Sequence, residues 1–64
     1  PNAEIVAVND TGTVVFTKLL KDYVLGRPVV LNNRIQTIAY HVETKKHFLF
    51  SMTANFDCLF MPLF

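Results

Sequence analysis

Two histidines and a glutamate lie close together in the segment HVETKKH, as His41, Glu43 and His47. Imidazole and carboxylate groups are common ligands of zinc and similar divalent ions, and they also serve as general acids and bases. A three-residue loop, Thr44–Lys46, would place Glu43 opposite His47 on paired strands, with His41 on the same face. This spacing matches no strong metal-binding signature, and turn tips normally face water. No metal or cofactor is therefore expected.

Cys58 is the single cysteine of the chain. It stands between Asp57 and Leu59 in an apolar segment, which favours a buried thiol that packs like a small hydrophobic residue. Reactive thiols need an accessible, electropositive setting. The chain has only two glycines, Gly12 and Gly26, and no glycine-rich phosphate loop. Since no nucleophile–base pair is visible either, we expect no catalytic residue and no enzyme.

The size and composition of the chain favour self-association. A chain of 64 residues has a small core, yet 52% of these residues are hydrophobic and six are Phe. A second copy is an economical way to cover so much apolar surface, and a homodimer is therefore expected. No apolar run reaches the roughly 18 to 20 residues that a membrane span requires. A lone cysteine without a recognisable signal peptide predicts a cytoplasmic location.

The elements that would position these residues differ between the two halves of the chain. Residues 4–8, EIVAV, are apolar at both parities, which predicts a strand covered on both faces. In residues 13–26, TVVFTKLLKDYVLG, apolar pairs recur every four residues, which predicts an amphipathic helix of about three turns. Gly26 and Pro28 would end this helix.

From Pro28 onward the hydrophobic period is two, which predicts strands. Asn32-Asn33 would form a tight turn, ETKK a second turn and ANFD a third. Ile38 and Tyr40 are expected to share a face with Phe48 and Phe50. The predicted fold is one α+β domain over residues 1–64, of order β-α-β-β-β-β, with one helix packed on one face of an antiparallel sheet.

The C-terminal segment FDCLFMPLF predicts an interaction surface. Apolar residues occupy both parities of this last strand, and one helix can cover only one face of the sheet. Burial within the chain or disorder of the tail are alternatives. We expect a non-enzymatic protein-binding domain, an adaptor, regulator or inhibitor, acting through this apolar surface. The expected interface residues are Phe56, Leu59, Phe60, Met61, Leu63 and Phe64.

The second hypothesis is a nucleic-acid-binding regulator. Basic residues on the expected helix and at the hairpin turns could follow a phosphate backbone if they converged. They are Lys18, Lys21, Arg27, Arg34, Lys45 and Lys46. The formal net charge is only +1, acidic residues are interleaved, and the aromatic residues stand at core positions. Protein binding is therefore the preferred interpretation.

Overall fold

The computed structural model describes residues 1–63, and these residues form strands and turns with no helix. The strands are β1 (Asn2–Val8), β2 (Val14–Lys21), β3 (Tyr23–Leu25), β4 (Val29–Leu31), β5 (Arg34–His41), β6 (Lys46–Thr53) and β7 (Cys58–Pro62). The α+β prediction is therefore wrong, because the described part of the chain is all β.

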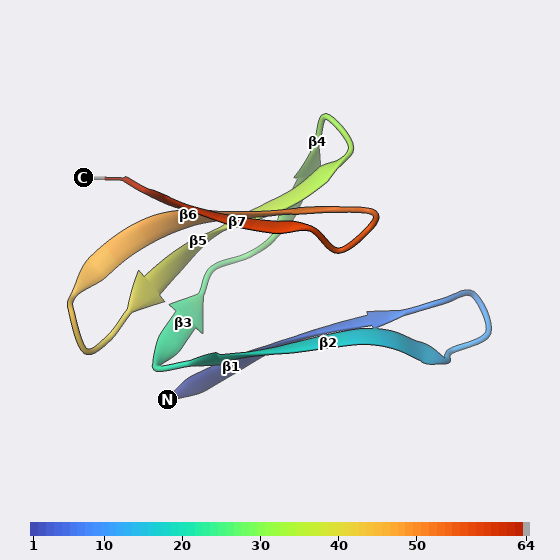
Figure 1. Cartoon of the computed structure of the whole chain (residues 1–64), viewed down its shortest axis with the longest axis horizontal. Helices are drawn as coiled ribbons and strands as arrows, with labels where there is room; N and C mark the ends of the chain where they lie inside the picture. The colour runs from blue at the N-terminus through green and yellow to red at the C-terminus, as the bar shows by residue number, and fades with distance from the viewer. Residues whose placement is uncertain (64) are drawn as a thin grey trace.

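The strands form two antiparallel sheets. β1 and β2 form a two-stranded hairpin, while β3, β5, β6 and β7 pair in that order in a larger sheet. β4 also pairs with β5, so β3 and β4 share one edge of that strand. In Figure 1 the hairpin lies below the larger sheet, and β3 rises from the end of β2. The hairpin takes the place that was expected for the helix.

The predicted helix is wrong because its apolar pairs place one residue on each face of a strand. In β2, Phe16 and Leu20 face the core, while their neighbours Val15 and Leu19 are exposed. Asp22 then adopts a positive φ of 63° between β2 and β3. After Asp22 the inward-facing side chains change from even-numbered to odd-numbered residues, so two strands together imitate the four-residue spacing of a helix. The β-branched residues at the beginning of the segment also favour the extended conformation.

The predicted turns are confirmed, but the predicted register of the second hairpin is wrong. Asn32 and Asn33 form a two-residue turn in which both have positive φ. In the β5–β6 hairpin, Tyr40 pairs with His47 and His41 with Lys46, so the loop has four residues, Val42–Lys45. Lys45 adopts a φ of 59°, and its backbone N–H donates to the carbonyl oxygen of His41 at 2.8 Å. Ile38 and Tyr40 therefore lie on the opposite face from Phe48 and Phe50.

The core lies between the hairpin and the inner face of the larger sheet. Ala39, Phe50 and Met52 are buried there. The small Ala39 is fully buried beside Phe48 on the next strand, which leaves room for the aromatic rings above it. Partly buried hydrophobic residues surround these three, namely Ile5, Phe16, Tyr23, Leu25, Phe48, Phe56, Cys58 and Phe60. One face of β1 is packed, whereas Val6 and Val8 on the other face are exposed, unlike the two-sided cover expected for this strand.

Candidate functional site

The C-terminal apolar residues are divided between the two faces of the larger sheet. Phe56 and Phe60 pack against the core, and the Phe60 ring lies 5.0 Å from the ring of Phe50. Leu59 and Met61 point the other way and are about half exposed. Leu63 is 38% exposed, and Phe64 lies outside the described residues. Of the expected interface residues, Phe56 and Phe60 are therefore packed within the fold, because they face the core of the sheet. Leu59, Met61 and Leu63 are exposed.

The outer face of the larger sheet carries an apolar row across three strands. Ile38 pairs with Leu49, and Leu49 pairs with Met61. Ile38 is 45% exposed and Met61 43%, since among residues 1–63 no element packs over this face. Leu59 extends the row on one side and Tyr40 on the other. We call Ile38, Tyr40, Leu49, Leu59 and Met61 the outer apolar row.

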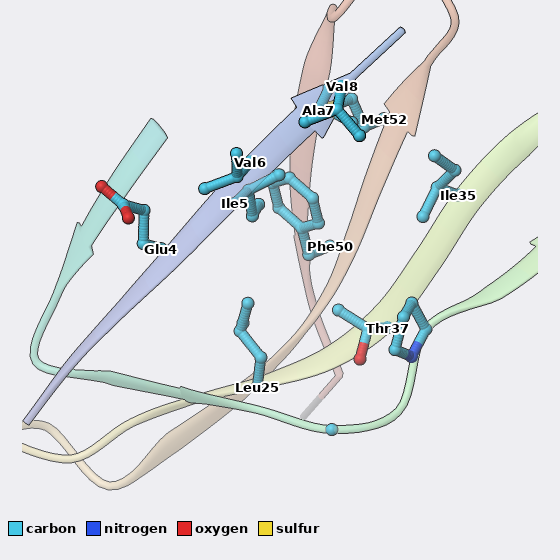
Figure 2. A pocket seen from close by; sticks show the side chains of 12 residues that line it. Glu4, Ile5, Val6, Ala7, Val8, Leu25, Ile35, Thr37, Phe50 and Met52 are labelled. Atoms are coloured by element: carbon cyan, nitrogen blue, oxygen red, sulfur yellow. The ribbon is translucent and has the colours of Figure 1, made fainter. Parts of the chain in front are cut away.

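A groove opens on the other side of the larger sheet, between β1 and β5 (Figure 2). Its volume is about 540 Å³. Phe50 and Met52 from β6 lie at its base, and Ile35 and Thr37 of β5 form one wall together with the chain segment that joins β3 to β4. The groove is therefore mainly apolar. It is lined by Glu4, Ile5, Val6, Ala7, Val8, Leu25, Gly26, Pro28, Ile35, Thr37, Phe50 and Met52.

The second wall of this groove is the free edge of β1. Five consecutive residues, Glu4–Val8, line it, although successive side chains of a strand point in opposite directions. Figure 2 shows the side chains of Glu4 and Val6 on the far side of β1 from Ile35. These two residues must therefore contribute mainly backbone. Within the described chain β1 pairs only with β2, so this edge presents unpaired backbone N–H and carbonyl groups.

The basic residues do not form one continuous patch. Lys46 stands at the turn end of β5–β6, while Arg34 stands at the opposite end, paired with Thr53. Seven residues of strand separate these two ends, or about 23 Å. The guanidinium of Arg34 donates to the hydroxyl of Ser51 at 3.1 Å. Lys18 faces the larger sheet and is half-buried, whereas Lys21 is exposed on the other face of β2.

A polar cluster forms where β2 passes into β3. One ligand atom each from Asp22, His41 and Glu43 lies within 4.8 Å of the other two. His47 is not part of it, because the observed register places this residue beside Tyr40 on the outer face, with ring centroids 4.7 Å apart. The predicted pairing of Glu43 with His47 is therefore wrong. The third member of the cluster is Asp22 and not His47. The sequence signal that could have identified Asp22 is its position between two apolar runs, where a turn is favoured.

Cys58 lies at the start of β7, half-buried against the core. Its thiol donates to the carbonyl oxygen of Phe56 at 3.5 Å. The side chain thus fills space beneath the β6–β7 turn, as expected for a small hydrophobic residue.

Comparisons of this chain with protein-family models, with curated proteins and with solved structures found no match. Among residues 1–63 there is no helix with the length and apolar character required to cross a membrane. The functional assignment therefore rests on the groove, the outer apolar row and the polar cluster.

Proposed function

We propose that this chain is a non-enzymatic protein-binding domain that accepts an extended segment of a partner protein in the groove beside β1. The observation that carries the proposal is the unpaired edge of β1 over five residues, next to an apolar groove base. An added strand would pair with the free backbone groups of β1 and place alternate side chains over Phe50 and Met52. This is the known mode of strand addition at an exposed sheet edge.

The shape of the groove favours a single extended segment as its occupant. β1 bounds the groove on one side, and β5 together with the segment around Gly26 and Pro28 bounds it on the other. A strand that already belongs to a hairpin would bring its neighbour against one of these walls. Five strand residues span about 16 Å, so the segment would be about five residues long. Its inward side chains would be apolar, because the base of the groove is.

A matched pair of substitutions tests this proposal. Ile35→Lys places a charge at the wall of the groove, whereas Ile38→Lys places the same charge on the outer face of the same strand. The two residues are 38% and 45% exposed, so both variants should fold. Ten-residue peptides would be selected from a displayed library on the wild-type chain, and their affinities measured by fluorescence anisotropy. We expect binding to survive Ile38→Lys and to be lost in Ile35→Lys.

Either of two results would contradict groove binding. One is a set of selected peptides that bind all three proteins equally well. The other is a selection that yields no alternating apolar peptide.

We also propose that the outer apolar row mediates weak homodimerisation, because self-complementary apolar faces can pack on each other across a two-fold axis. In the larger sheet β5 and β6 have eight residues each, β7 has five, and β3 and β4 have three each. With about 4.8 Å between strands and about 3.3 Å per residue, they give a planar footprint of roughly 430 Å². A stable interface buries about 800 Å² on each partner, so the expected dimer is a weak one that forms with increasing concentration. Sedimentation equilibrium should detect it for the wild-type chain and for Ile35→Lys. Ile38→Lys should remain monomeric.

Nucleic-acid binding has less support, since Arg34 and Lys46 lie at opposite ends of their strands. We place the domain in the reducing cytoplasm, an inference supported by its single free cysteine.

A further inference from the structure

The polar cluster at the β2–β3 junction is slightly wider than a metal site. The ligand atoms of Asp22, His41 and Glu43 lie no more than 4.8 Å from one another. A point equidistant from three atoms at that spacing lies about 2.8 Å from each, whereas zinc–nitrogen and zinc–oxygen bonds measure about 2.0–2.2 Å. Each ligand atom would therefore move by less than about 1 Å to bind zinc. Glu43 is exposed, so its side chain is free to make this adjustment.

Backbone and side-chain contacts already hold two of the ligands in place. The backbone N–H of Val42 donates to the carbonyl oxygen of Asp22 at 2.8 Å, which ties the junction to the end of β5. Nδ1 of His41 lies 2.8 Å from the hydroxyl oxygen of Thr44. The His41 ring also rests on Tyr23, with centroids 4.8 Å apart. The backbone N–H of Thr44 also donates to this Nδ1, at 3.4 Å. Metal binding through Nε2 would require Nδ1 to carry the hydrogen and donate it to the Thr44 hydroxyl, which replaces this longer contact and gives the usual arrangement of a ligating histidine.

The chemistry of the three side chains selects among metals. Two ionised carboxylates neutralise a divalent cation. Calcium and magnesium prefer sites made wholly of oxygen, while an imidazole nitrogen suits zinc and other late first-row metals. Three protein ligands leave a fourth position for water.

We propose that Asp22, His41 and Glu43 form a binding site for a divalent transition-metal ion such as zinc, at the junction between the two sheets. Asp22 belongs to the chain segment that leaves the hairpin, and His41 and Glu43 belong to the end of β5 and the turn after it. A bound ion would link these segments and stabilise the position of the hairpin against the larger sheet. This site is separate from both the groove and the outer apolar row.

The test is titration of the untagged chain with zinc chloride, followed by calorimetry and by thermal unfolding. We expect one zinc ion per chain and a higher unfolding temperature in its presence, because an ion that binds only the folded chain stabilises it. Calcium at the same concentration should leave the unfolding temperature unchanged. Asp22→Asn should weaken zinc binding at least about tenfold. Asparagine tolerates the positive φ of this position, so the backbone should be preserved.

Three further variants separate this site from other places where zinc might bind. His41→Ala should weaken binding as Asp22→Asn does. His47→Ala, which removes the other histidine, and Cys58→Ser, which removes the thiol, should both bind zinc as the wild-type chain does. The proposal would be overturned by a wild-type chain that does not bind zinc, or by binding that depends on His47 or Cys58 and is indifferent to Asp22.

Discussion

Phe56 is a position where glycine should be less destabilising than alanine, the reverse of the usual order in a β protein. It has a φ of 67°, a left-handed conformation that is rare for a bulky residue. The backbone N–H of Phe56 donates to the carbonyl oxygen of Thr53 at 2.9 Å, and the N–H of Thr53 donates to the carbonyl oxygen of Asp57 at 3.0 Å. This is a short turn followed by a left-handed residue, a position that glycine usually occupies. The Phe56 ring compensates by stacking on Phe16 at 4.5 Å, with the two planes 2° apart.

The structure allows the effects of Phe56→Ala and Phe56→Gly to be compared. Both variants lose the stack, about 0.5–1.5 kcal/mol, and the burial of a half-exposed ring, roughly 1 kcal/mol. Alanine keeps a left-handed backbone that costs roughly 1–2 kcal/mol, which glycine avoids. Glycine makes the unfolded chain more flexible, at a cost of about 0.4–1 kcal/mol. The Gly variant should therefore be more stable than the Ala variant by about 0.5–1 kcal/mol.

Urea denaturation followed by circular dichroism would measure this difference. With a slope near 1 kcal/mol/M, the midpoint of Phe56→Gly should lie about 0.5–1 M above that of Phe56→Ala. The control is the same pair of substitutions at Leu59, in the regular strand β7, where Ala should be the more stable variant by about 0.5–1 kcal/mol. If Ala is more stable than Gly at both positions, the explanation of the turn is wrong.

Three other predictions concern the core and the turns. Phe50→Ala should lower the free energy of unfolding measured in urea by about 3–5 kcal/mol, because Phe50 is fully buried; this is about half or more of the roughly 3–10 kcal/mol expected for a chain of this length. Asn9→Ala should lower the free energy of unfolding in urea by about 1 kcal/mol, because the Asn9 side-chain oxygen accepts bonds from the backbone N–H groups of Thr11 and Thr13. Asn33→Gly should raise the thermal midpoint slightly, since glycine is the preferred second residue of such a turn.

Local signals in the sequence predicted the turns and the strands of the second half. Asn32-Asn33 was sufficient because a two-residue turn depends only on the residues within it. The register of β5 against β6 was mispredicted because Ile38 and Tyr40 looked more suited to the core than Thr37 and Ala39. Thr37 and Ala39 face the core because the rings of Phe50 and Phe48, on the strand beside them, leave room only for small side chains. This space is a property of the packed core and cannot be read from the sequence of one strand. The groove was missed for the same reason, since its walls come from strands far apart in the sequence.

Asp22 accounts for both the failed helix and the polar cluster. Inward-facing residues have even numbers in β2, such as Phe16 and Leu20, and odd numbers in β3, such as Tyr23 and Leu25. A single residue at positive φ changes the parity between the two strands and carries the chain from one sheet to the other. Aspartate tolerates this conformation better than most residues do. The same local geometry holds its backbone against Val42 and brings its carboxylate near His41, so the residue that joins the two sheets also completes the proposed metal site.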